Sequence, residues 1–197
     1  MVAACVKTGW SAKAPGLRYL HRVSRPLVNV RKLGPMTASP PTVKVFTSWS
    51  HEDRGLKDKL LPRLTSHLDL LSGVRIELWD DTQLQIGEDF TDTITDKITR
   101  CDYGLLLLSQ HYLNSDFIRD HELPRFVGPE ADKGALPVAL RPLPFDGSRD
   151  LRGIERRVVF QHRGKAFLEL RTDNERNTFA SELATQIRSR VLPDAQG

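Results

Sequence analysis

Short apolar segments alternate with longer amphipathic segments from residue 43 to residue 191 of this chain. The apolar segments have the length and the composition of strands. They lie at residues 43–47, 74–78, 103–108, 136–140 and 158–160. The four consecutive leucines at 105–108 are typical of a strand that is buried on both faces of a parallel sheet. The alternation therefore predicts an α/β fold, with a five-stranded parallel sheet and helices on both of its faces.

Prolines interrupt two of these elements. Leucines recur at intervals of three or four residues between positions 56 and 71, which predicts a helix. Pro62 lies inside this pattern and is expected to kink or split the helix. Pro137 removes one donor from the hydrogen-bond ladder of the sheet, so we expect it at the start of the fourth strand.

Three further helices are expected at residues 90–98, within 109–126 and at 172–191. Five strands in about 150 residues give the domain a flavodoxin-like size. In such sheets, ligands bind outside the carboxyl ends of the strands, where the strand order reverses. The loops after the first three strands are therefore the segments in which we expect a site.

The charge is distributed unevenly along the chain. Of the 29 basic residues, seven lie in residues 1–41, which contain no Asp or Glu. The remaining residues hold 22 basic and 25 acidic side chains. We therefore expect a basic tail at 1–41, one domain at 42–192 and a short C-terminal tail at 193–197. Because the positive charge belongs to the tail, it gives no reason to expect that the domain binds nucleic acid.

The basic tail has more than one interpretation. Its Arg-rich, acid-free composition is typical of an organelle transit peptide and also fits an amphipathic or lipid-binding arm. We favour disorder, or upstream sequence from an early start codon, because Met36 would make a natural start before the first strand. No apolar run approaches the roughly 20 residues of a membrane span. Two cysteines, Cys5 and Cys101, form neither a disulfide framework nor a metal-binding pattern, which indicates a cytoplasmic protein.

Several common catalytic motifs are absent from the sequence. There is no GxxxxGK[ST] or GxGxxG phosphate loop and no GxSxG nucleophile elbow. His121-Glu122 is followed by Leu-Pro-Arg, so the HExxH zinc motif is not formed. The third strand ends in Leu108-Ser109-Gln110, without the carboxylate that a phosphoryl receiver needs at this position. These observations argue against an NTPase, a serine hydrolase, a zinc protease and a receiver domain.

Three segments with a distinctive pattern accompany the first three predicted strands. They read VFTSWSHED at 45–53, LWDDTQLQIGEDF at 78–90, and LLLLS at 105–109 followed by SDFIRDHEL at 115–123. Together they resemble the TIR domain in its bacterial form. The motifs of that family are an apolar strand ending in F-x-S-[YW]-[SR], a [WF]-x-D…G segment called the BB loop, and an apolar strand ending in Ser, followed by S-x-x-x-x-x-x-E-L on a helix. The resemblance covers residues 43–192 and implies a flavodoxin-like TIR fold.

The resemblance also implies an activity. Many TIR domains cleave NAD⁺ at the nicotinamide–ribose bond and require one glutamate on the helix after the third strand, which matches Glu122 here. NAD⁺ would be the substrate, with no cofactor and no metal. One carboxylate is chemically sufficient, because nicotinamide leaves as a neutral pyridine and needs no general acid, unlike the leaving group in ordinary glycoside hydrolysis. The positive charge that moves onto the ribose is what a carboxylate can stabilise.

The position of Glu122 has a second explanation. On a helical wheel it falls between Ile118 and Phe126, so its carboxylate lies within an apolar stripe. A carboxylate in such a stripe lines a cleft or is paired. The alternative to a catalytic role is an ion pair within the helix with Arg119 or Arg125, each three residues away.

Other positions match substrate-binding parts of the family pattern. The expected substrate-binding residues are Ser48, Trp49, Ser50, Asp80, Gly87 and Ile118. Trp49 is a candidate for stacking on a ring and equally for a structural role, and Gly87 is expected to supply a backbone conformation. Ile118 departs from the family, because catalytic members usually have an aromatic residue there. We expect Phe90 to be a core anchor and His51 and His121 to be solvated.

Three functions are compatible with this resemblance. The first is an NAD⁺ hydrolase or cyclase in immune or anti-phage signalling, which would self-associate through TIR–TIR contacts and act with a separate sensor or effector protein. The second is a non-catalytic adaptor or effector that works by TIR–TIR contacts through the BB loop. The third is an enzyme that transfers nucleosides from other nucleotides.

Overall fold

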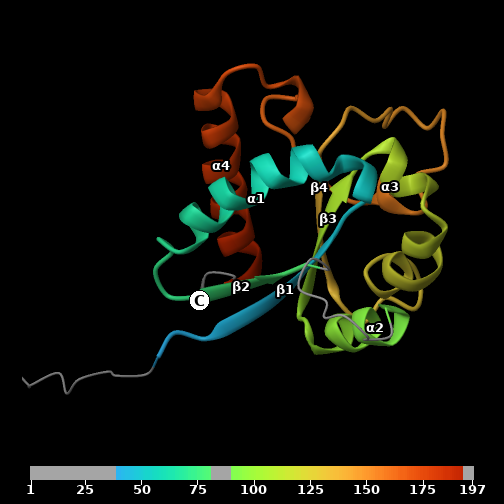
Figure 1. The fold of residues 1–197 in the computed structure, drawn as a ribbon, viewed down its shortest axis with the longest axis horizontal. Helices are drawn as coiled ribbons and strands as arrows, with labels where there is room; N and C mark the ends of the chain where they lie inside the picture. Colours follow the sequence, from blue (N-terminus) through green and yellow to red (C-terminus); the bar gives the residue numbers. More distant parts are fainter. Residues whose placement is uncertain (1–38, 81–89, 193–197) are drawn as a thin grey trace, which may run out of the picture. The chain divides into compact units, whose positions relative to one another are not determined.

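Four parallel strands form the sheet in the computed structural model, which describes residues 39–80 and 90–192 (Figure 1). They are β1 (Thr42–Ser48), β2 (Arg75–Trp79), β3 (Tyr103–Leu108) and β4 (Gly134–Ala139), in the order β2-β1-β3-β4. The predicted α/β fold with a parallel sheet is confirmed. The strand order reverses between β1 and β3, so the crevice beyond their carboxyl ends is where a ligand is expected. Residues 1–38 of the tail expected at 1–41, the expected tail at 193–197, and Gly87 lie outside the described residues.

The predicted fifth strand is reduced to a single bridge. Phe160 pairs with Val138 through two hydrogen bonds: the Phe160 amide donates to the Pro137 carbonyl at 2.8 Å, and the Ala139 amide donates to the Phe160 carbonyl at 3.0 Å. Extending the ladder to Val158 would require an N–H on Pro137, and proline has none. Val158 accordingly leaves the edge and is 95% exposed. The predicted count of five strands was therefore wrong.

Pro137 was also expected at the start of its strand, and it is instead the fourth residue of β4. Its position is compatible with the sheet because its carbonyl faces the outer edge, where it accepts from Phe160, and its nitrogen faces the same way. The ladder between β4 and β3 uses the alternate residues, such as Gly134, whose amide donates to the Asp102 carbonyl at 3.1 Å. The missing N–H therefore affects only the outer edge.

The first helix is continuous through its proline. α1 (Arg54–Leu68) contains Pro62 without being split, contrary to one of the two expected outcomes. Proline removes one internal hydrogen bond, while Leu60 and Leu64 on the inner face of the helix are completely buried. The helix ends at Leu68, earlier than the leucine pattern suggested.

The expected helix within 109–126 is broken into three short pieces. They are α3 (Gln110–Asn114), the π-helical turn η3 (Ile118–Glu122) and the 3-10 turn η4 (Leu123–Arg125). Ser115 has an extended backbone (φ −73°, ψ 118°) that ends α3, and Pro124 cannot donate to the next helical turn. Because of this break, the segment that carries Glu122 does not continue along the axis of α3.

Helices cover both faces of the sheet, as predicted (Figure 1). Leu105 and Leu107 pack in one cluster with α1 and with α4 (Asp173–Val191), while Leu106 and Leu108 pack in a second cluster with α2 (Phe90–Arg100) and η3. All four leucines are completely buried, as expected for a strand covered on both faces. None of the described helices combines the length and the apolar character that crossing a bilayer requires.

Two Gly→Ala substitutions should have opposite effects on stability. A Cβ on Gly104 would lie 2.5 Å from the ring of Phe126, which is completely buried, so Gly104→Ala should lower the free energy of unfolding by about 1–3 kcal/mol. Gly55 lies in α1 and a Cβ there would meet nothing within 4 Å, so Gly55→Ala should raise it by up to about 1 kcal/mol. Urea unfolding measures both, and equal effects would contradict this packing.

Candidate active site

A cleft lies at the carboxyl ends of β1 and β3, where the strand order reverses. Its volume is about 500 Å³. Its lining residues come from the segment directly after β1 and from the segment that runs from α3 through η3: Trp49, Ser50, His51, Glu52, His111, Asn114, Ser115, Phe117, Ile118 and Glu122. The cleft, called the Glu122 cleft below, therefore brings together four of the seven residues that the sequence singled out.

Glu122 is buried in the wall of this cleft with only 5% of its surface exposed. The Ser48 hydroxyl donates to Glu122 Oε2 at 2.5 Å, and the Ser48 and Tyr112 hydroxyls are 2.8 Å apart. Because Ser48 has one hydroxyl proton and gives it to Glu122, Tyr112 must be the donor in the second bond. The structure thus builds a chain of donors from Tyr112 through Ser48 to the carboxylate.

Tyr112 remains a neutral donor in this chain. Complete burial raises the pKa of Tyr112 well above its usual range, and the negative charge of Glu122 raises it further, while the hydrogen bond to Ser48 acts in the opposite direction. Tyr112 was not identified from the sequence. Its position four residues after the end of β3, one helical turn from the site, was the available signal.

The two arginines considered as partners of Glu122 make their ion pairs with aspartates. Arg119 contacts Asp116 at 2.6 Å and Asp120 at 2.8 Å. Arg125 contacts Asp132 at 2.9 Å. Glu122 is buried, as are Ile118 and Phe126, and its carboxylate accepts from Ser48.

Trp49 forms one wall of the cleft and is itself 96% buried, with 4% of its surface exposed. The ammonium group of Lys57 lies 4.2 Å from the centre of its indole ring, and the His51 ring stacks on it at 4.9 Å. Lys57 also binds Asp80 at 2.9 Å. Asp80 therefore does not line the cleft, but it reaches the cleft wall through Lys57 and Trp49.

The remaining predicted residues differ in their placement. Ser50 and Ile118 are buried and line the cleft. His51 is exposed, as expected, but it lines the cleft, whereas His121 is exposed and packs against Phe117 with ring centres 4.9 Å apart. The side chain of Phe90 lies outside the part of the structure that can be described.

A second buried carboxylate, Asp53, lies behind the cleft and was missed in the sequence. It is 1% exposed. Its Oδ1 accepts from Arg141 Nε at 2.5 Å, and its Oδ2 accepts from the Ser109 hydroxyl. Ser109 in turn accepts from the Tyr112 amide at 3.0 Å. Since Ser109 directly follows β3 and Arg141 lies two residues after β4, the rule that sites lie at the carboxyl ends of strands could have identified both.

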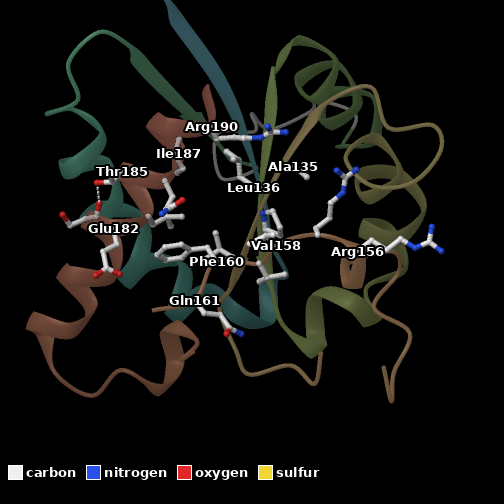
Figure 2. A pocket seen from close by; sticks show the side chains of 17 residues that line it. Ala135, Leu136, Arg156, Val158, Phe160, Gln161, Glu182, Thr185, Ile187 and Arg190 are labelled. Atoms are coloured by element: carbon white, nitrogen blue, oxygen red, sulfur yellow. Dashed lines mark hydrogen bonds between the residues drawn. The ribbon is translucent and has the colours of Figure 1, made fainter. Parts of the chain in front are cut away.

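A larger groove, of about 800 Å³, lies elsewhere, between the outer edge of β4 and α4. Figure 2 shows Ala135, Val158 and Phe160 within it and Arg190 at its side. It contains none of the residues singled out by the sequence and no buried carboxylate, so size alone does not make it the better catalytic site. Within residues 39–80 and 90–192, no cluster of three or more His, Cys, Asp or Glu side chains is arranged to hold a metal ion.

The buried hydroxyl of Tyr112 predicts a pH-dependent stability. Tyr112→Phe should lower the free energy of unfolding at neutral pH by about 0.5–1.5 kcal/mol, because the hydrogen bond to Ser48 is lost. The raised pKa of Tyr112 means that its contribution is complete below its usual pKa of 10.0 and is lost as the pH rises above it, where only the unfolded chain ionises. Denaturation between pH 7 and 11 should show the two proteins converging by about 1.4 kcal/mol per pH unit above pH 10. A difference in the free energy of unfolding between the two proteins that stays constant up to pH 11 would contradict a buried, neutral Tyr112.

Comparison with known proteins agrees with this geometry. A protein of Sinorhizobium fredii (strain NBRC 101917 / NGR234), named "Uncharacterized protein y4lF", is 41% identical over 99 residues. The aligned part is 49% of this chain and 30% of that protein, so the chain matches under a third of its relative. Residues 45–184 match the family model described as "TIR domain". Because this match covers most of the chain and contains the strands and the cleft described above, the chain belongs to the TIR domain family.

Proposed function

We propose that this protein is an NAD⁺ nucleosidase, a hydrolase or cyclase that cleaves the nicotinamide–ribose bond in the Glu122 cleft. The observation that carries this proposal is the buried carboxylate of Glu122, held at 2.5 Å by Ser48 at the point where the strand order reverses. A carboxylate there is a costly feature for a protein to bury, and a catalytic role gives it a reason.

Glu122 acts on the ribose in this proposal. As the bond to nicotinamide breaks, the positive charge of the ring nitrogen moves onto the ribose, and the nearby carboxylate stabilises it. At about 4 Å and an effective dielectric constant near 20, such a pair is worth roughly 4 kcal/mol, or about a thousandfold in rate. The chain from Tyr112 through Ser48 holds the carboxylate in place at Oε2, in the wall of the cleft.

The aromatic contact usual in catalytic family members must come from another residue here, because Ile118 occupies that position. Trp49 and Phe117 both line the cleft. Trp49 is covered by Lys57 and His51, whereas Phe117 is only half-buried and belongs to the same segment as Glu122. Phe117 is therefore the better candidate for stacking on a ring of the substrate.

Glu122→Gln should reduce nicotinamide release from NAD⁺ about a thousandfold, because the amide keeps the size of the side chain and removes its charge. The assay uses the full chain at high concentration, since TIR enzymes generally complete their site by self-association. Glu130→Gln, a substitution of an exposed residue away from the cleft, is the matched control and should retain wild-type activity.

The outcomes separate the hypotheses. Equal activity of Glu122→Gln and wild type would reject the catalytic role of Glu122, although the protein would still be an enzyme. No release by concentrated or assembled wild type would favour the adaptor function. Release from nucleotides other than NAD⁺ would favour the nucleoside-transferring alternative.

The adaptor function is favoured by the groove beside β4. Val158 is 95% exposed there, and Arg156, Arg157 and Arg190 line the same groove. Residues 80–96 of the chain, which include the BB loop, contain six Asp or Glu and no Lys or Arg. Opposite charges on one chain are suited to TIR–TIR contacts between copies. Sensor or effector proteins would be recruited to such an assembly.

Val158→Asp should therefore weaken self-association, because it places a charge in the apolar part of the groove and repels an acidic segment. Leu70→Asp is the matched control, since Leu70 is 81% exposed and does not line the groove. Sedimentation velocity at low and high salt measures the effect. Equal loss of association in both variants would argue against this groove as the contact surface.

A further inference from the structure

A second, smaller hollow lies beside the Glu122 cleft. Its volume is about 150 Å³, and Asn114 lines both hollows. It is formed by α3 on one side and by the loop after β4 on the other. Its polar lining consists of Gln110, Asn114, Arg149, Asp150 and Arg152. Four of these five side chains carry N–H donors and one is a carboxylate, so the hollow is suited to an anion.

The loop that carries the two arginines is anchored to the same core as the Glu122 cleft. Leu151 and Ile154 are 2% and 1% exposed and belong to the apolar cluster that contains Tyr112 and Ile118. At the other end of the loop, Arg141 binds the buried Asp53. The loop that carries Arg149 and Arg152, whose side chains are exposed, is therefore anchored to the same core as Tyr112 and Ile118.

The charge of Arg152 also acts on the segment that carries Glu122. Arg119 is the main cause of the lowered pKa of Asp120 in η3, and the charge of Arg152 contributes to the same shift. Arg152 Nη1 lies 3.5 Å from Asp150 Oδ2. A guanidinium has five N–H donors, so this contact leaves donors for a ligand.

The backbone of Arg152 has a conformation that suits glycine better. Its φ is +59°, and Gly153 follows with φ +86°. The Arg152 amide donates to Asp150 Oδ1 at 2.8 Å, and the Gly153 amide donates to Glu155 Oε2 at 3.0 Å. Strain of this kind at a non-glycine residue motivates the hypothesis that its side chain has a function.

We propose that Asn114, Arg149 and Arg152 form a diphosphate subsite that continues the Glu122 cleft. This inference rests on the proposed function. The order of charges matches the substrate, because NAD⁺ carries its positive charge on the nicotinamide ring and its negative charges on the two phosphates. Glu122 lines the larger hollow, Arg149 and Arg152 line the smaller one, and Asn114 lines both. Arginine is the side chain best suited to bind phosphate oxygens in pairs.

The probe for this subsite is ADP, which contains the diphosphate and lacks the bond that is cleaved. Titration calorimetry on the full chain compares wild type with the double variant Arg149→Ser, Arg152→Gly. Glycine suits the positive φ of residue 152, so the variant should keep or raise its melting temperature. ADP binding should weaken by about tenfold or more, the loss expected when charge-assisted hydrogen bonds are removed. The KM for NAD⁺ should rise while kcat changes little.

The matched control is Arg163→Gly with Arg171→Ser. Arg163 is the other described non-glycine residue with a positive φ, +52°, and Arg171 is exposed. The control removes the same charge and the same kind of strain from residues that line neither hollow. It should bind ADP as wild type does.

The subsite and the proposed function fail in different ways. ADP binding that depends on Arg149 and Arg152 in a protein that releases no nicotinamide would support the subsite and reject the nucleosidase. Nicotinamide release with an unchanged KM in the double variant would support the nucleosidase and overturn the subsite. The subsite is also overturned if wild type does not bind ADP, or if the control loses as much affinity as the double variant.

Discussion

Two carboxylates, those of Asp53 and Glu122, are buried at the carboxyl end of the sheet, and much of the surrounding structure supplies their hydrogen bonds. Burying a carboxylate is costly unless protein donors replace the lost water. Ser48 supplies Glu122, and Ser109 and Arg141 supply Asp53. These donors come from the ends of β1, β3 and β4, so satisfying the two charges ties three strand ends together. These hydrogen bonds therefore help to define the geometry at this end of the sheet.

The sequence was sufficient for the fold because its strongest signals are local. Four consecutive leucines in a chain of alternating strands and helices can be buried only in a sheet that is covered on both faces. The details that were wrong depend on partners distant in sequence. The length of the fifth strand depends on the missing N–H of Pro137, about 20 positions before the residues that would pair with it. The continuity of α1 depends on side-chain packing that outweighs one lost hydrogen bond.

Part of the candidate site could be predicted from the sequence for the same reason, because its signals are also local. Ser48, Trp49, Ser50, Ile118 and Glu122 lie in motifs that can be read along the chain, and the structure brings them together. Tyr112 lies outside the three motifs, and Asp53 ends the first motif but was not selected as a site residue. Their roles arise from side chains that meet across the sheet, 64 residues apart for Tyr112 and Ser48 and 88 for Asp53 and Arg141. The place of a residue after a strand can indicate that it lies near the site, but it does not show which distant side chain it will contact.

The proline in β4 has a consequence for how copies of this domain can assemble. An open sheet edge invites another strand to pair with it, which is a common route to uncontrolled aggregation. In β4 the outward-facing residues include Pro137, which cannot donate, and its carbonyl is already occupied by Phe160. A strand of a neighbouring chain therefore could not form a continuous hydrogen-bond ladder with β4, because Pro137 has no N–H to donate. At the β4 edge, a contact between copies would therefore use side chains and not a continued hydrogen-bond ladder; β2 forms the other edge of the sheet.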